Sequence, residues 1–131
     1  MGLDLKSLEA VAEAMVASGK GILAADESTG TIGNRLAQIN TESTVENRNG
    51  YRDLLFSAEG IENYISGVIM YDETLRQSSL ADDIAYPEYL ASKGMIPGIK
   101  VDTGAHDLAG CLLYTSPRPR DATLSRMPSS A

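Results

Sequence analysis

The chain has 131 residues, a length that allows one domain of ordinary size. Its formal net charge of −7 disfavours nucleic acid as a partner, because phosphate backbones repel an acidic protein. Hydrophobic residues make up 43% and charged residues 22%, as in globular proteins, and no apolar run approaches the ~20 residues that span a bilayer. One cysteine and one histidine exclude a disulfide scaffold and a typical zinc site. We therefore expect a cytoplasmic chain without membrane contact, metal or other cofactor.

The first half of the chain alternates helical periodicity with one apolar run. Apolar residues at helical spacing predict a helix over about residues 4–18. The run Gly21–Ala25 has no alternation, which is typical of a strand covered on both faces. Two further helices are expected over 31–39 and 44–58, the second capped by Thr44.

The second half repeats this organisation. An apolar run over 66–71 predicts a second strand, and a short helix is expected over 74–78. Another helix is expected over 87–93, since Pro87 suits a first helical turn. A third apolar run covers 97–101. The sequence therefore predicts an α/β fold with three parallel strands and flanking helices.

Each apolar run is followed by an aspartate, with Ser, Thr or Gly within the next two positions. These aspartates are Asp26, Asp72 and Asp102. Ligands bind beyond the carboxyl ends of parallel strands, in barrels and in open sheets alike, so the pattern favours a binding site there. The alternative is that each group only caps the following helix. No glycine-rich phosphate loop is present, which disfavours a nucleotide cofactor.

A group of motifs in residues 1–110 resembles class I fructose-bisphosphate aldolase. The likeness is densest at Gly19–Ile32, which reads GKGILAADESTGTI, and at Gly67–Leu75, which reads GVIMYDETL. It continues collinearly through Glu46–Arg48, Tyr51–Leu55, Gly98–Asp102 and Leu108–Gly110. The resemblance implies a (β/α)8 TIM barrel, of which this chain would supply the first three parallel strands.

The resemblance also implies an activity and residue roles. The family cleaves fructose 1,6-bisphosphate to dihydroxyacetone phosphate and glyceraldehyde 3-phosphate through a lysine imine, without a metal. Asp26 would act at the C4 hydroxyl, and Lys100 would support substrate binding and charge balance as a catalytic-site lysine. Thr31 and Arg35, and also Ser28, would contact the substrate, with capping as the alternative role of Ser28. A guanidinium suits phosphate because it donates two parallel hydrogen bonds.

The strand pattern around Lys100 supports an active-site origin independently. Alternation places Lys100 on the same strand face as Asp102, and a lysine inside a covered sheet is costly unless it is paired. We expect a charge cluster that includes Asp102 and draws on Asp26 or Asp72. The alternatives are a structural ion pair or a lysine on an exposed strand. His106 is expected in a solvated loop.

Two departures from the family reduce positive charge, because Asn34 and Thr103 stand where lysines are common. After Gly110 the likeness stops, and residues 111–131 are rich in Ser, Pro and Arg. We expect an aldolase segment over 1–110 and a disordered tail over 111–131 that resembles translated sequencing-adapter DNA. The imine-forming lysine would lie on a later strand, so we expect the 131-residue chain to be inactive.

Two functions from different classes remain open. The first is a fragment of a lyase acting on a small sugar phosphate, whose parent is a homo-oligomer, often a tetramer in the family. The second is a small sugar-phosphate or anion-binding α/β module without covalent catalysis. Another sugar-phosphate barrel enzyme, such as a transaldolase, fits fewer of the motifs.

Overall fold

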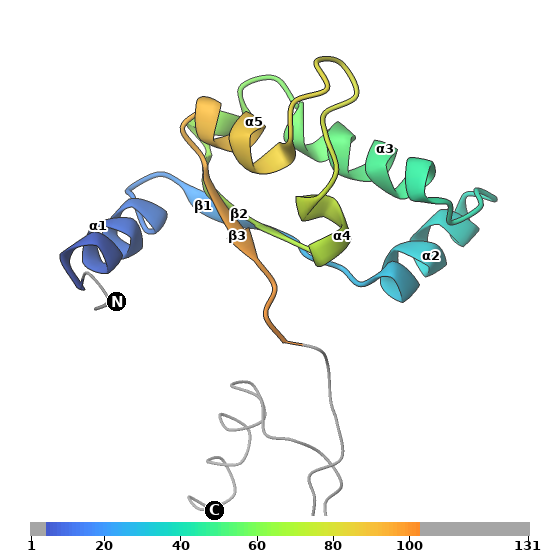
Figure 1. Ribbon diagram of the computed structural model, residues 1–131, viewed down its shortest axis with the longest axis horizontal. Helices are drawn as coiled ribbons and strands as arrows, with labels where there is room; N and C mark the ends of the chain where they lie inside the picture. The colour runs from blue at the N-terminus through green and yellow to red at the C-terminus, as the bar shows by residue number, and fades with distance from the viewer. Residues whose placement is uncertain (1–4, 103–131) are drawn as a thin grey trace, which may run out of the picture. The chain divides into compact units, whose positions relative to one another are not determined.

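The computed structural model describes residues 5–102, in which helices alternate with three strands (Figure 1). In chain order the elements are α1 (Leu5–Met15), β1 (Gly21–Ala25), α2 (Thr29–Gln38), α3 (Val45–Phe56), a 3-10 turn (Ile61–Asn63), β2 (Ile65–Met70), α4 (Asp72–Leu75), α5 (Tyr86–Ser92) and β3 (Ile96–Ile99). The chain divides into two compact units, residues 1–100 and 101–131. The expected tail over 111–131, Thr103 and His106 lie outside the described residues.

The three strands form one parallel sheet in the order β1-β2-β3, as the sequence predicts. The pairing aligns Ala25 with Met70 and Met70 with Ile99, so the three strands end level with one another. We call this end of the sheet the carboxyl edge. Residues that follow the strands directly are thereby brought close together.

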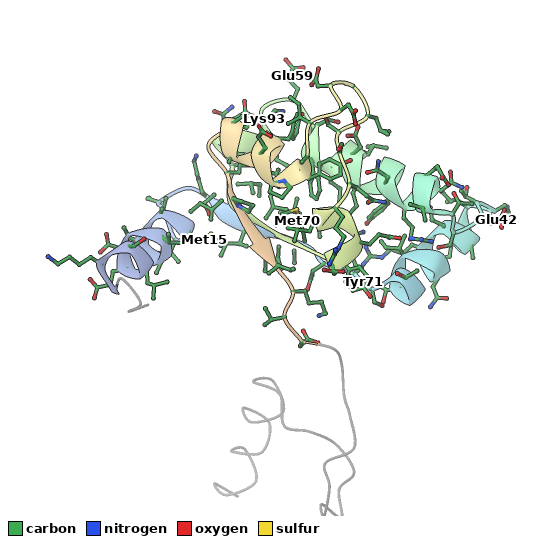
Figure 2. All side chains as sticks on the ribbon, viewed as in Figure 1. Met15, Glu42, Glu59, Met70, Tyr71 and Lys93 are labelled. Carbon is green, nitrogen blue, oxygen red and sulfur yellow. The ribbon has the colours of Figure 1, made fainter. Side chains whose placement is uncertain are left out.

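The core lies between the sheet and the helices that cross it. Figure 1 shows α3 and α5 on the same side of the sheet, and the labelled Met70 lies on that side in Figure 2. The rings of Phe56 on α3 and Tyr86 on α5 meet edge to face, with centroids 5.0 Å apart. The buried core cluster consists of Ala25, Phe56, Val68, Met70, Tyr86, Tyr89, Leu90 and Met95.

The opposite face of the sheet is only partly covered within the described residues, where Met15 of α1 lies over the buried Gly67. Ile22 on β1 lies on that face, because its partner Gly67 alternates with the core residues Val68 and Met70, and it is 45% exposed. The expectation of a strand covered on both faces is therefore not met at β1 within the described residues, whereas the predicted parallel strands with flanking helices are confirmed. The strand order β1-β2-β3 means that the chain moves across the sheet in one direction. Right-handed crossovers therefore place the β1–β2 and β2–β3 connections on the same face of the sheet.

Several predicted boundaries shift by a few residues. α1 ends at Met15 rather than at residue 18, and α4 begins at Asp72 rather than at residue 74, so that two acidic residues occupy its first turn. The predicted cap Thr44 accepts a hydrogen bond from the Asn47 N–H. Between residues 5 and 102, no helix has the length and apolar character needed to cross a bilayer.

Candidate functional site at the carboxyl edge

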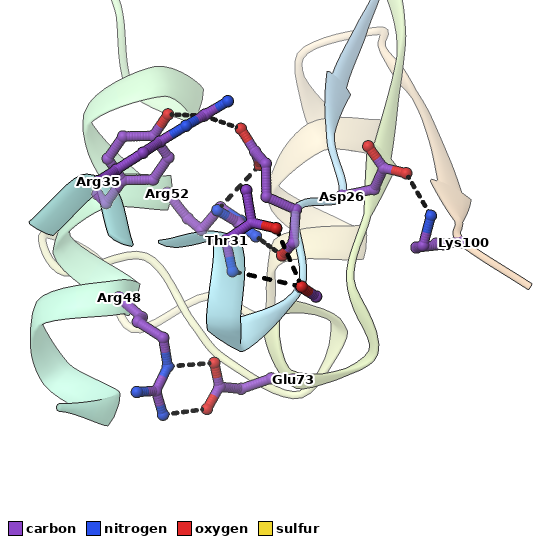
Figure 3. A network of polar contacts seen from close by, with 10 residues as sticks. Asp26, Thr31, Arg35, Arg48, Arg52, Glu73 and Lys100 are labelled. Carbon is purple, nitrogen blue, oxygen red and sulfur yellow. Dashed lines mark hydrogen bonds and ion pairs between the residues drawn. The ribbon is translucent and has the colours of Figure 1, made fainter. Parts of the chain in front are cut away.

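Asp26 and Lys100 form an ion pair at the carboxyl edge. Asp26 follows β1 and Lys100 follows β3, and the Lys100 Nζ lies 3.4 Å from the Asp26 Oδ2 (Figure 3). Each side chain is 26% exposed, so both groups remain accessible to a ligand. The two residues are 74 positions apart in sequence, and the sheet alone brings them together.

The position of Lys100 differs from the one expected from alternation. β3 ends at Ile99 because that residue is paired with Met70, the last residue of β2. Lys100 is therefore not in the middle of a strand, although its N–H still donates to the Met70 carbonyl at 2.9 Å. Asp72 pairs with Arg76, the C-cap residue of α4.

Ser28 and Thr31 lie at the N-terminus of α2. Ser28 is the N-cap, and its Oγ accepts from the Thr31 N–H at 3.4 Å and lies 3.1 Å from the Thr31 Oγ1. The capping alternative thus describes what Ser28 does in this structure. Both hydroxyls also stand beside backbone N–H groups at a helix start, where anions are favoured.

Arg35 is held by two side chains beside the carboxyl edge. Its Nη1 is paired with the Glu27 carboxylate and donates to the Tyr51 Oη at 2.8 Å. The hydrogen bond to Tyr51 and the charge of Glu27 raise the pKa of Arg35. The guanidinium is nevertheless 48% exposed, so it can still meet a ligand from solvent.

Arg52 contacts the other carboxylate oxygen of Glu27. It projects from α3, it is 3% exposed, and its Nη1 lies 3.2 Å from the Glu27 Oε2. Its Nη2 donates to the Glu27 backbone carbonyl at 2.7 Å. Burial lowers the pKa of Arg52, and the charge of Glu27 opposes that change. Arg52 therefore fixes the backbone directly after Asp26.

Arg48, one helical turn before Arg52, joins α3 to α4. Its Nε and Nη2 donate to the two carboxylate oxygens of Glu73 at 2.8 and 2.7 Å, and its Nη1 donates to the Ser43 carbonyl at 2.6 Å. These hydrogen bonds hold the pKa of Glu73 below its usual value. The segment after β2 is thus tied to the segment before α3.

The sequence reasoning assigned no role to Glu27, Arg48, Arg52 or Glu73. A partial signal exists, because Arg48 and Arg52 are four residues apart and therefore share one face of α3. Acidic residues directly after β1 and β2 can form ion pairs with these two arginines. Which carboxylate meets which guanidinium depends on the packing of α3 against the sheet.

A cavity of about 370 Å³ lies away from these residues. It is lined by Val45, Glu46 and Asn49 of α3 and by residues 77–80 and 83, so neither Asp26 nor Lys100 contributes to it. Within residues 5–102, no group of three or more His, Cys, Asp or Glu side chains is placed to hold a metal ion. The chemistry available at the carboxyl edge is that of paired carboxylates, guanidinium groups and one amine.

Comparison with known proteins finds fructose-bisphosphate aldolases. Residues 7–121 match the sequence model of fructose-bisphosphate aldolase class-I. The chain is 51% identical over 109 residues to a probable fructose-bisphosphate aldolase class 1 of Xylella fastidiosa, covering 83% of this chain and 32% of the relative. It is 51% identical over 106 residues to fructose-bisphosphate aldolase B of Gallus gallus, covering 80% of this chain and 29% of the relative.

A solved structure gives the same result for the fold. Fructose-bisphosphate aldolase from Plasmodium falciparum, crystallised with TRAP and a small-molecule inhibitor, superposes with a TM-score of 0.79 at 41% identity. The match covers 96% of this chain and 36% of that chain. The chain thus spans about a third of the length of its relatives.

Proposed function

Because this chain belongs to the class I fructose-bisphosphate aldolase family, we propose that it forms the first part of an enzyme that reversibly cleaves fructose 1,6-bisphosphate. The products are dihydroxyacetone phosphate and glyceraldehyde 3-phosphate. The observation that carries the proposal is the ion pair of Asp26 and Lys100 at the carboxyl edge. In β/α barrels, this is the end of the strands where substrates are bound and transformed.

The side chains at the carboxyl edge match the charges that develop in this reaction. A lysine amine condenses with the substrate ketone and loses water, and the resulting iminium accepts the electron pair of the broken carbon–carbon bond. Asp26 takes the C4 hydroxyl proton and stabilises the cationic intermediate. Lys100 balances the charge of Asp26 and of the substrate, while Arg35, Ser28 and Thr31 contact a phosphate group.

Within this proposal, the 131-residue chain alone does not cleave the substrate. It contains four lysines, and Lys100 has the supporting role above. Lys20 donates to the Glu62 carbonyl at 2.8 Å, and Lys93 lies 4.8 Å from the centre of the Tyr89 ring. Lys6 is an exposed residue of α1. We assign the imine-forming lysine to a later strand of the complete barrel.

A hybrid enzyme tests the proposal. Residues 1–110 of this chain replace the matching segment of the Xylella fastidiosa relative, and cleavage of fructose 1,6-bisphosphate is measured. We expect activity in the hybrid, a loss of at least a hundredfold in kcat for Asp26→Asn, and no turnover or borohydride-trapped adduct with the 131-residue chain. The matched control is Asp83→Asn, because Asp83 lies in a loop with φ of 53°, which Asn also adopts readily.

The remaining expectations are proposed together with the function. The complete enzyme is expected to be a cytoplasmic homo-oligomer that takes a sugar phosphate and needs no cofactor, and sedimentation of the full-length protein measures its oligomeric state. We propose that residues 111–131 are foreign to the gene even though the family match extends to residue 121. Sequencing of genomic DNA past codon 110 tests this, and a contiguous gene that encodes these residues would overturn it. Tight sugar-phosphate binding by the 131-residue chain, together with an inactive hybrid, would favour the binding module instead.

A further inference from the structure

The Glu27 carboxylate is shared by two arginines, and this inference rests on the proposed contact of one of them, Arg35, with a substrate phosphate. We propose that Glu27 competes with phosphate for Arg35, and that Arg52 is the positioning residue that allows Glu27 to release it. Glu27 then sets the affinity of the site for phosphate monoesters without touching the ligand.

The two arginines bind different atoms of Glu27. Arg35 is paired with Oε1, whereas Arg52 lies against Oε2 and also donates to the backbone carbonyl (Figure 3). One carboxylate therefore faces two guanidinium groups, and the three side chains have one net positive charge. An approaching phosphate is attracted by that charge, but Arg35 already has a carboxylate partner.

The burial of the two arginines shows which of them can exchange partners. Arg52 is 3% exposed, whereas Arg35 is 48% exposed. A phosphate group from solvent can reach Arg35 and cannot reach Arg52. Tyr51 accepts a hydrogen bond from Arg35, and its ring lies 5.6 Å from the Arg52 guanidinium carbon. Tyr51 thus holds the Arg35 guanidinium beside the site when the ion pair between Arg35 and Glu27 breaks.

Arg52 removes the penalty for that exchange. The Glu27 side chain is 15% exposed, and a carboxylate at that depth is costly when it has no cationic partner. Arg52 remains paired with it after Arg35 has turned to the phosphate. Within residues 5–102, the Arg52 Nε and Nη1 and the Glu27 Oε2 have no hydrogen-bond partner, so Arg52 has donors left to engage Glu27 more closely.

Two single substitutions with opposite effects test the proposal. Glu27→Gln removes the competitor, and we expect inorganic phosphate to bind about tenfold more tightly. Arg52→Met leaves Arg35 as the remaining partner of Glu27, and we expect phosphate to bind about tenfold more weakly although Arg52 never meets the ligand. Arg35→Gln is expected to abolish binding. Each variant is made in the hybrid enzyme and titrated with phosphate by calorimetry.

The double variant Glu27→Gln/Arg52→Met has the same site charge as the unmodified protein and leaves no buried charge unpaired, so it serves if a single variant fails to fold. We expect it to bind phosphate more tightly than the unmodified protein. The control Glu59→Gln makes the same charge change on an exposed residue far from Tyr71 and the carboxyl edge (Figure 2), and we expect no change in binding.

A purely structural role would weaken binding in both single variants and in the double variant, and that result overturns the proposal. Retained phosphate binding in Arg35→Gln also overturns it. The expected binding pattern in a hybrid without lyase activity would support the competition and reject the proposed function. Normal cleavage with equal phosphate affinity in all variants would reject the competition alone.

Discussion

Arg48 and Glu73 face each other in two parallel hydrogen bonds, which connect α3 to the first turn of α4. Their side chains are 12% and 27% exposed, so solvent screens the pair only in part. We expect Glu73→Gln to lower the free energy of unfolding by about 1–3 kcal/mol near neutral pH. Urea denaturation of the hybrid and its variant measures this difference.

The same pair has a defined pH dependence. Hydrogen bonds from Arg48 lower the pKa of Glu73 in the folded state from its ordinary 4.5, so the folded protein releases that proton more readily than the unfolded chain. The stabilisation is present above pH 4.5 and is lost as the pH falls through the lower folded pKa. The difference between the unmodified protein and Glu73→Gln must therefore shrink in acid. A difference that grows there would contradict this assignment.

Met15 packs over Gly67, so a larger side chain at position 67 would have to displace the end of the Met15 side chain. A Cβ at Gly67 would clash with the Met15 sulfur and lie 3.2 Å from the Ile96 carbonyl oxygen. We expect Gly67→Ala to destabilise the fold by about 1–3 kcal/mol and Met15→Ala to relieve part of that loss, since the contact with Ile96 remains. Thermal melting of the single and double variants measures both effects.

Gly50 supplies the matched control for this substitution. It lies within α3 with nothing near the position of an added Cβ. Gly50→Ala should be neutral or stabilise the protein by up to about 1 kcal/mol, because alanine is the better helix former. Equal destabilisation at both glycines would mean that steric contact with Met15 is not the cause.

Tyr86 is fully buried, and its hydroxyl donates to the Asn49 Oδ1 at 2.7 Å while lying 3.1 Å from the Asp53 Oδ1. Burial, followed by the charge of Asp53, raises the pKa of Tyr86 above its ordinary 10.0. The unfolded chain therefore loses this proton first, and stability declines as the pH rises above 10. Tyr86→Phe should make that decline shallower and cost about 1–2 kcal/mol at neutral pH. Denaturation between pH 8 and about 11 compares the two.

Ser28 is predicted to have two separable roles. Its hydroxyl caps α2, so Ser28→Ala should cost about 1 kcal/mol of stability, and Ser28→Asn should recover most of it because Asn also caps helices. If the hydroxyl also contacts substrate, KM for fructose 1,6-bisphosphate rises in both variants of the hybrid. A normal KM in the stable Asn variant would leave capping as the role of Ser28.

The sheet could be predicted because its signals are local. The three apolar runs and the aspartates after them lie within short segments, and periodicity together with turn residues places them within two or three residues. The end of β3 could not be predicted from its own composition. The predicted run extends through Lys100 to the apolar Val101, but the strand stops at Ile99, where its partner Met70 ends β2.

The ion pairs show the limit of the same reasoning. A contact of Lys100 with Asp26 or Asp72 was expected because one parallel sheet brings these residues to the same edge, and the structure pairs Lys100 with Asp26. The pairings of Arg48 with Glu73 and of Arg52 with Glu27 each join residues 25 positions apart on different elements. They depend on the rotation of α3 about its own axis, which composition and periodicity leave undetermined.

The hydrogen bond from Arg52 to the backbone carbonyl of Glu27 has a consequence for reading natural variation in this family. A replacement of Arg52 would shift Glu27 and with it the carboxylate of Asp26, the preceding residue. The replaced residue itself is buried and does not contact a metabolite. Surveys that score only the residues lining a substrate would classify such a variant as harmless, and enzyme kinetics would reveal the defect.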